Sequence, residues 1–200
     1  MRVSRSTPSV PAASPLDVAD TDRALIVRAQ AGQASAFEEL VRRHQGIAFR
    51  AARSFGGFDE VDDIVQDAFV KAHRGLEAFD PGRPFRPWLI AFVANEASHR
   101  RRSRARRENL HDKMIRKRAE SEPSAEDVTL RRRDLECLRD ALERLGEKDR
   151  RVIIYRHLLE FSENETSDAL GCPPGTVKSR LARALVRLRA TLAEAGVGNV

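Results

Sequence analysis

Apolar residues recur at steps of three and four along most of this chain of 200 residues, and this spacing restricts the fold to packed helices. The longest run would place one stripe on a single helix: Ala36, Phe37, Leu40, Val41, His44, Ile47, Ala48, Ala51, Ala52 and Phe55. Gly56-Gly57 is expected to end that helix. Alternating strand patterns of useful length are missing, so we predict an all-α fold.

Two more helices are expected before a change in composition. One would bury Val61, Ile64, Val65, Ala68, Phe69, Ala72 and Leu76. The segment 75–87 holds three prolines and two glycines, which is too many for a helix. The next helix is predicted to begin near Trp88, to turn Leu89, Phe92 and Val93 inward, and to continue into a block of arginines.

The helical pattern resumes after a polar segment. Segment 108–131 is charged and poor in apolar residues, so we predict a flexible linker that is partly helical at best. A further stripe follows: Leu135, Leu138, Ala141, Leu142 and Leu145, and then Val152, Ile153, Tyr155, Leu158 and Leu159 in the next helix. The predicted organisation is a disordered tail (1–21), a helical domain (22–107), the linker (108–131) and a second helical domain (132–195).

Positive charge is concentrated in two places. The chain carries 36 Lys and Arg against 30 Asp and Glu, a net charge of +6. Segment 99–118 contains ten Lys and Arg against two acids, and segment 174–192 contains five and no acid. Two basic blocks on an acidic background indicate a polyanion that is contacted at two separate places.

Several protein classes are disfavoured. No apolar run approaches the roughly 18 residues of a membrane span, and prolines interrupt the N-terminal segment, which lacks the apolar core of a signal peptide. Cys137 and Cys172 lie far apart without a CxxC or histidine partner, so we expect no metal, no cofactor and no disulfide. A reducing, cytoplasmic compartment is predicted.

Residues 162–188 fit a helix-turn-helix. Ser162-x-x-Glu165 has the form of a capping box, Gly171 would end the short helix, and Pro173-Pro174 would start the next. That last helix would bury Val177, Leu181, Ala184, Leu185, Leu188 and Leu192 and expose Lys178, Ser179, Arg180, Ala182 and Arg183. Such side chains can contact bases and phosphates in a major groove. The alternative is an ordinary amphipathic helix with a solvated basic face.

Aromatic and basic residues surround the breaker-rich segment. Its loop contains Phe79, Arg83, Phe85 and Arg86, and it leads into Trp88, Phe92 and Asn95. An aromatic loop beside an amide could hold an unstacked base. The alternative, which the residues alone favour, is that Phe79, Trp88 and Phe92 belong to the core.

One predicted helix is acidic: it carries Asp59, Glu60, Asp62, Asp63 and Asp67 near its start. Asp63 and Asp67 are spaced as a metal or acid–base pair would be, but no His, Cys or nucleophile stands at ligand spacing. Acids repel DNA, so docking onto a basic protein partner is the favoured interpretation.

Taken together, these motifs resemble a bacterial extracytoplasmic-function (group IV) sigma factor. Residues 62–72 (DDIVQDAFVKA) are similar to region 2.2 of that family, residues 85–89 (FRPWL) and 94–97 (ANEA) to regions 2.3 and 2.4, and residues 171–181 (GCPPGTVKSRL) to region 4.2. Three ordered motifs at these separations are a specific match that covers both predicted domains.

The resemblance implies roles for particular residues. Asp62, Asp63, Gln66 and Asp67 would dock on the β′ clamp helices of core RNA polymerase, and the β flap would be a second polymerase contact. A base flipped from the −10 element would be held by Phe79, Phe92 and Asn95, with Lys71 and Arg83 nearby. The −35 element would be read by Thr176, Lys178, Ser179, Arg180 and Arg183.

The resemblance further implies a non-enzymatic, cytoplasmic factor that is associated with the nucleoid when active, with promoter DNA and an anti-sigma factor as partners. Two alternatives stay open: a helix-turn-helix regulator that does not replace a sigma factor, and an RNA-processing enzyme with basic arms. The chain also departs from the family pattern. Thr166 and Ser167 stand where Ile and Ala are usual, which would cost about 1–3 kcal/mol each if the polar groups were unbonded, and Gly146 stands where a helix-starting proline is common.

Overall fold

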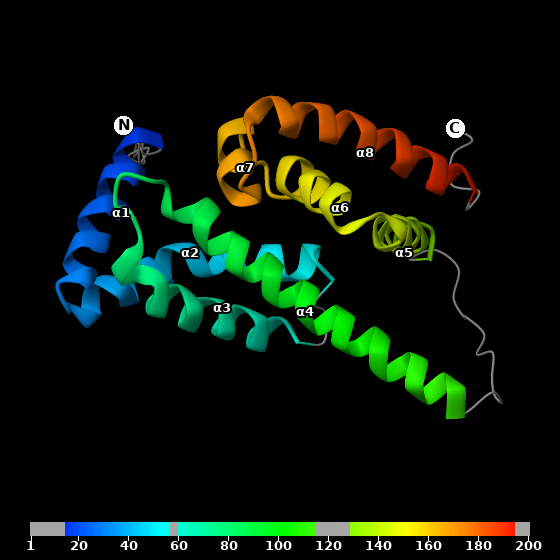
Figure 1. Cartoon of the computed structure of the whole chain (residues 1–200), viewed down its shortest axis with the longest axis horizontal. Helices are drawn as coiled ribbons and strands as arrows, with labels where there is room; N and C mark the ends of the chain where they lie inside the picture. The colour runs from blue at the N-terminus through cyan, green and yellow to red at the C-terminus, as the bar shows by residue number, and fades with distance from the viewer. Residues whose placement is uncertain (1–14, 57–59, 115–128, 195–200) are drawn as a thin grey trace, which may run out of the picture.

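The computed structural model describes residues 15–56, 60–114 and 129–194, and all regular structure in these ranges is helical (Figure 1). The helices are α1 (Pro15–Gln30), α2 (Ala34–Ser54), α3 (Val61–Gly75), α4 (Phe85–Met114), α5 (Thr129–Arg144), α6 (Glu147–Ile153), α7 (Glu163–Leu170) and α8 (Pro174–Glu194). A 3₁₀ turn (Leu76–Ala78) follows α3 and a π turn (Ile154–Leu158) follows α6. The prediction of an all-α fold is confirmed.

The first bundle consists of α1 to α4, with α2, α3 and α4 packed on one another. The predicted stripe of the acidic helix is buried in full: Val61, Ile64, Val65, Ala68, Phe69, Ala72 and Leu76. The periodic face of α2 is also inward, with Leu40, Ala48 and Ala51 fully buried. A buried polar pair ties α1 to α2, because His44 Nε2 lies 2.7 Å from Asp22 Oδ2.

Two predicted boundaries were wrong. The disordered tail was expected to reach residue 21, but α1 begins at Pro15, a residue suited to a first helical turn; residues 1–14 lie outside the described residues. The helix expected near Trp88 begins three residues earlier, at Phe85. Pro87 falls within the first turn of α4, where the missing N–H removes no helical hydrogen bond, so this proline does not delay the start.

The second bundle consists of α5 to α8 and has its own core, made of Ala141, Leu142, Leu145, Val152, Ile153, Val177, Ala184 and Leu188. Leu158, which follows in the π turn, is instead 41% exposed. The predicted linker (108–131) begins and ends in helix, because α4 continues to Met114 and α5 begins at Thr129. Residues 115–128 lie outside the described residues, so its flexibility stays a prediction.

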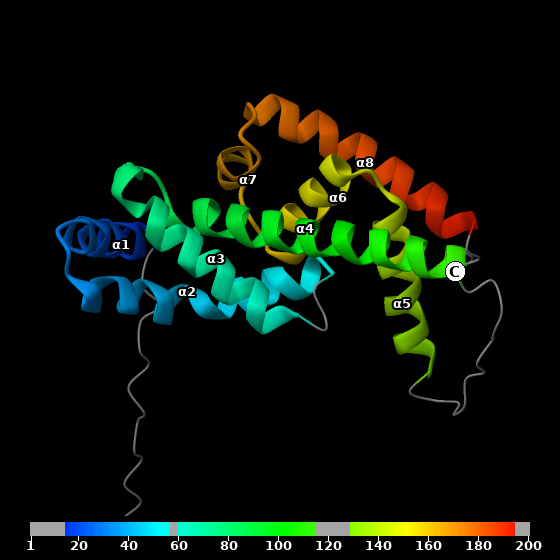
Figure 2. The same ribbon diagram turned by 60° about the horizontal axis from the view of Figure 1, so that its bottom comes forward.

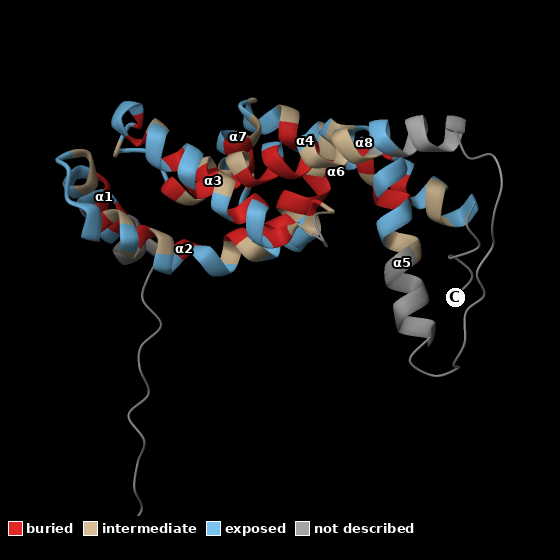
Figure 3. Cartoon of the chain, turned by 90° about the horizontal axis from the view of Figure 1, so that it is seen from below, coloured by how far each residue is buried: buried red, intermediate tan, exposed pale blue. Residues whose placement is uncertain are grey.

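The two bundles pack against each other. Five residues of the second bundle join the core cluster of the first: Ile154, Tyr155, Leu159, Phe161 and Ala169. α7 sits over the first part of α4 in both views (Figures 1 and 2). Buried residues accordingly gather around α4, which packs on both α3 and α7 (Figure 3).

Gly146 is predicted to be replaceable by proline with a gain in stability. It precedes α6 with φ −58° and ψ 146°, angles that proline adopts without strain, and a Cβ there would have no atom within 4 Å. Gly146→Pro should therefore raise the free energy of unfolding by about 0.4–1 kcal/mol by restricting the unfolded chain. Urea denaturation measures the change.

Gly171 provides the contrasting variant, since its φ of +61° is left-handed. Gly171→Ala should lower stability by about 1 kcal/mol. Equal effects of the two substitutions would show that backbone conformation does not control either position.

Candidate nucleic-acid and protein interfaces

The turn between α7 and α8 is built by local chemistry. Ser162 Oγ accepts a hydrogen bond from the Glu165 amide at 3.2 Å, and Glu165 Oε2 accepts one from the Ser162 amide at 2.9 Å. This reciprocal pair starts α7, and Gly171 ends it in the left-handed conformation with φ +61° and ψ 39°. α8 begins at Pro174. The predicted helix-turn-helix is confirmed in its caps, its turn and its order.

The two unusual polar residues of α7 are both hydrogen-bonded. Thr166 is fully buried, and its hydroxyl donates to the Ser162 carbonyl at 2.8 Å. The Ser167 hydroxyl donates to the Cys172 carbonyl at 2.6 Å, across the turn itself. Neither residue therefore carries the penalty of an unpaired buried hydroxyl, and Ser167 helps to fix the geometry of the turn.

α8 separates an apolar face from a basic one. Val177, Ala184 and Leu188 are buried, while Lys178, Ser179 and Arg183 are exposed. Thr176 and Arg180 are half-buried, and Arg180 Nη1 lies 3.8 Å from Cys172 Sγ. Five charged or polar groups therefore share the outer surface of the first turns of α8, as a major-groove helix requires.

The predicted base-holding residues divide into two groups. Phe79 is only 6% exposed, and its ring centroid lies 4.3 Å from that of Trp88, so it is part of the core in this structure. Phe92 is half-buried against Trp88, and Asn95 is exposed one turn further along α4. The structure thus places an aromatic edge and an amide on one helix stripe, and Phe79 packs on Trp88, which contacts Phe92.

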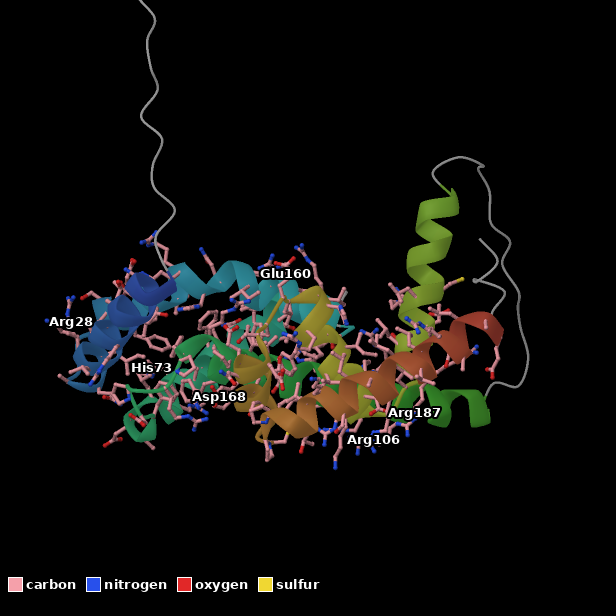
Figure 4. The ribbon with its side chains drawn as sticks, turned by 90° about the horizontal axis from the view of Figure 1, so that it is seen from above. Arg28, His73, Arg106, Glu160, Asp168 and Arg187 are labelled. Atoms are coloured by element: carbon pink, nitrogen blue, oxygen red, sulfur yellow. The ribbon has the colours of Figure 1, made fainter. Side chains whose placement is uncertain are left out.

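The two basic residues predicted near that site already have acidic partners. Lys71 Nζ pairs with Glu96, which follows Asn95 directly and is buried. Arg83 Nη2 lies 3.6 Å from Asp168 Oδ1 on α7 (Figure 4 labels Asp168). Sequence reasoning missed Glu96 and Asp168 because neither forms part of a local motif with its partner.

The residues predicted to dock on a protein partner form an acidic ridge, which we define as Asp62, Asp63, Gln66 and Asp67 on α3. The first three are exposed and Asp67 is half-buried. Arg100 of α4 lies alongside and donates to Asp67 Oδ2 at 2.6 Å and to Asp63 Oδ2 at 3.3 Å. Partial burial opposes the charge of Arg100, but these carboxylates raise the pKa of its guanidinium overall.

The ridge continues into an apolar groove between α2 and α3. The groove, about 420 Å³ in volume, is lined by Phe37, Val41, Gln66, Phe69, Val70, His73 and Arg74. Val70 is 42% exposed and contributes to the apolar lining of this groove. Gln66 belongs to both the ridge and the groove. A surface that is acidic at one end and apolar at the other suits a protein partner and repels DNA.

Two kinds of site are missing from the described ranges. No cluster of three or more His, Cys, Asp or Glu side chains that could hold a metal ion occurs among these residues. None of the described helices combines the length and the apolar character that a bilayer span requires.

A helix-turn-helix with an exposed basic face, and a second bundle with an exposed acidic ridge, are typical of a two-module transcription protein. Comparisons with known proteins agree. Residues 40–107 match the family described as Sigma-70 region 2, and residues 135–188 match Sigma-70, region 4. The RNA polymerase sigma factor CnrH of Cupriavidus metallidurans is 37% identical over 86% of this chain and 95% of its own length.

Further relatives and solved structures point the same way. The ECF RNA polymerase sigma-E factor of Haemophilus influenzae is 32% identical over 82% of this chain and 91% of its own length. The structure of CnrH in complex with the cytosolic domain of CnrY has a TM-score of 0.64 and 33% identity, and covers 88% of this chain and 99% of that chain. The structure of the sigma factor RpoE of Bartonella quintana in complex with the anti-sigma factor NepR has a TM-score of 0.57 and 28% identity. It covers 78% of this chain and 96% of that chain. The chain belongs to the ECF RNA polymerase sigma factors of the sigma-70 family.

Proposed function

We propose that this sigma factor binds core RNA polymerase through the acidic ridge and its groove and carries it to promoters. It contributes no catalytic step, because RNA synthesis belongs to the polymerase. The observation that carries the proposal is the presence, on one chain, of a basic duplex-reading helix and an exposed acidic ridge on a different bundle. A helix-turn-helix regulator acting alone would need only the first of these.

We assign a separate function to each of the two bundles. Residues 15–107 form the module for polymerase binding and the −10 element, where Phe92 and Asn95 hold a flipped base and Phe79, Lys71 and Arg83 surround it. Residues 132–195 form the module for the −35 element, read by Thr176, Lys178, Ser179, Arg180 and Arg183. Residues 108–131 link the modules. The proposed DNA contacts are supported by the exposure of Asn95 on the first module and of Lys178, Ser179 and Arg183 on the second.

Partners follow from the same surfaces. The ridge suits the β′ clamp helices, and the second bundle would contact the β flap. Two similar solved structures are described as complexes, of CnrH with CnrY and of RpoE with the anti-sigma factor NepR. We therefore include an anti-sigma factor among the partners of this chain. The cytoplasm, and the nucleoid when the factor is active, is the proposed location.

Run-off transcription with core RNA polymerase tests the function. Core enzyme with this chain should start at defined sites on genomic DNA fragments, and core enzyme alone should not. A chain that binds the same fragments but leaves core enzyme without specific starts would be a DNA-binding regulator, and the proposal would be abandoned.

Arg183 is predicted to read sequence at the −35 element. Its side chain is exposed on α8, with Nε donating to the Ser179 carbonyl at 3.2 Å, so the rest of the guanidinium is available to a base edge. Arg183→Ala should weaken binding of the preferred duplex by about 1–3 kcal/mol and relax discrimination at one base pair. Fluorescence anisotropy with a set of single-base variants of the duplex measures both.

Arg189→Ala is the matched control, since Arg189 is exposed on the same helix, nearly two turns further along. It should change affinity little and leave discrimination intact. An equal loss on every duplex with Arg183→Ala would identify a phosphate contact instead.

A further inference from the structure

An apolar cavity, which we call the α2–α5 cavity, lies where the end of α2 meets the second bundle. Its volume is about 160 Å³, and its apolar walls are Phe55 directly after α2, Leu138 and Leu142 on α5, and Leu158 in the π turn. None of the described residues that line it belongs to the acidic ridge or to the basic face of α8. The functions proposed above therefore leave this cavity unused.

One wall of the cavity carries a buried cation. Arg150 lines the cavity and is only 3% exposed. Its Nη2 donates to Glu147 Oε2 at 2.7 Å, but its Nε is buried without a hydrogen-bond partner. A buried donor that lacks an acceptor costs free energy, and native proteins satisfy nearly all such groups. An acceptor bound in the adjoining cavity would supply the missing partner.

Positive charge exceeds negative charge behind this wall. Glu147 pairs with Arg150, with Arg151 at 2.8 Å and with Arg101, so one carboxylate serves three guanidinium groups. Burial would raise the pKa of Glu147, but hydrogen bonds from Ser98, Arg101 and Arg151 lower it overall. Even with Glu147 ionised, the group keeps an excess of positive charge, which favours an anion nearby.

The mouth of the cavity is also basic. Arg53 and Arg139 are exposed lining residues, and Glu143 is the one acid among the described lining residues. Glu143 stands on the side of Gly56, where a Cβ would lie 3.8 Å from its Oε1. With Arg150, three arginines thus face one glutamate around an apolar space. This combination suits a molecule with an apolar body and a negative charge.

The turn at the rim has an unusual backbone. Leu158 was expected to be buried by its helical spacing, yet it ends a π turn and is 41% exposed. Glu160, labelled in Figure 4, follows with φ +55°, a left-handed conformation that residues with a Cβ rarely adopt. π turns and strained backbone are frequent at functional sites. A ligand seated against Leu158 would cover an apolar side chain that otherwise meets water.

The volume sets the size of the ligand. A cavity of about 150 Å³ lined by apolar side chains holds a molecule as large as benzene. A carboxylate attached to such a body adds little volume and forms a charge-assisted hydrogen bond with a guanidinium. We infer that the α2–α5 cavity binds a small carboxylate with an apolar body of about this size, its carboxylate on Arg150 and its apolar body against Phe55 and Leu142. The inference does not depend on the proposed function.

Fluorine NMR of 4-fluorobenzoate with the full chain tests the site. The probe signal should broaden in the presence of the protein, with a dissociation constant at or below about 1 mM, as expected for a ligand of this size. Benzoate should displace the probe. Benzamide has the same ring without the charge and should bind at least about tenfold more weakly, because a neutral acceptor makes a weaker hydrogen bond with Arg150. Acetate, tested at equal ionic strength, should not displace the probe.

Two matched substitutions locate the binding. Leu158→Glu places an acid at the mouth of the cavity, on a side chain that is already exposed, and should raise the dissociation constant at least about tenfold. Val186→Glu makes the same kind of change on α8, at a residue that is 64% exposed and does not line the cavity, and should leave the constant unchanged. Arg150→Met keeps an apolar stem and should make benzoate and benzamide bind equally. If Arg150→Met does not fold, as judged by circular dichroism, the Leu158→Glu comparison decides.

Three results would overturn the inference. Absence of broadening at about 10 mM probe would show that the cavity does not bind this class of molecule. Equal displacement by benzamide or by acetate would reduce the site to an apolar patch or to general attraction of anions. Unchanged affinity in Leu158→Glu would place the binding elsewhere on the chain. None of these results bears on run-off transcription, so a failure here and a failure of the proposed function stay distinguishable.

Discussion

Asp63→Arg should weaken binding of core RNA polymerase at least about 100-fold while the chain stays folded. The carboxylate of Asp63 is 66% exposed at the N-terminal turn of α3, next to exposed Asp62 and Gln66. Reversal would place a positive charge in the centre of the ridge, facing a basic partner, and like charges brought together at an interface cost several kcal/mol. Titration of labelled core enzyme gives the dissociation constant, and circular dichroism gives the helical content.

The intramolecular consequence of this substitution is small by comparison. Asp63 accepts a hydrogen bond from Arg100 at 3.3 Å, but Arg100 keeps its shorter bond to Asp67 at 2.6 Å. The helix N-terminus also favours an acid there by about 0.3–1 kcal/mol. The free energy of unfolding should therefore fall by no more than about 1–2 kcal/mol. Most of this decrease comes from the loss of an exposed ion pair and of the favourable interaction with the helix dipole.

Asp140→Arg is the matched control for Asp63→Arg. Asp140 is 64% exposed on α5 of the second bundle, so the same change of charge occurs at the same exposure but away from the ridge. Unchanged polymerase affinity in Asp63→Arg would refute the docking assignment. An equal loss in both variants would show that net charge, and not the ridge, controls binding.

Local chemistry explains why much of the fold could be predicted. The stripe of α3 was predicted residue by residue, because the helical period alone determines which side chains share a face. The caps of α7 were predicted from Ser162, Glu165 and Gly171, because their partners lie within a few residues. The exposure of Lys178 and Arg183 follows from the same periodicity on α8.

Contacts between distant residues could not be predicted in this way. Arg83 and Arg86 stand in a proline-rich segment without a helical repeat, and their partners are acids about 80 positions later in the chain. Nothing around Tyr155 or Phe161 in the sequence indicates that they pack against the first bundle. The Arg100 pairs were also missed, although Glu96 and Arg100 are spaced as helical neighbours.

Aromatic residues outside a periodic run were the hardest to place. Phe79 and Phe85 lie in a segment where glycine and proline interrupt every repeat, so no helical period shows which way their side chains face, and only the residue type favoured the core for Phe79. The structure buries both, at 6% and 2% exposure. Their rings pack on Trp88, which in turn contacts Phe92, and this connects the stability of the first bundle to the shape of the proposed −10 surface.

Phe85→Ala should lower the free energy of unfolding by about 3–5 kcal/mol, the range for removing a buried phenylalanine. The ring centroid of Phe85 lies 5.1 Å from that of His44, 5.6 Å from that of Trp88 and 6.1 Å from that of Phe79. Its loss would leave a cavity between α2, the loop and the first turn of α4. Urea denaturation should show a lower midpoint, and tryptophan fluorescence should shift as Trp88 loses its neighbour.

Phe85→Leu and Val70→Ala separate the cavity from other effects of this change. Leucine refills part of the space, so Phe85→Leu should recover more than half of the lost stability. Val70 is 42% exposed in the first bundle, and Val70→Ala should lower the free energy of unfolding by no more than about 1 kcal/mol.

Phe85 packs on Trp88, which contacts Phe92. Phe85→Ala should therefore also reduce binding of −10 single-stranded DNA under conditions where the chain is still folded. Full retention of that binding would mean that the aromatic support is not needed to shape the −10 surface.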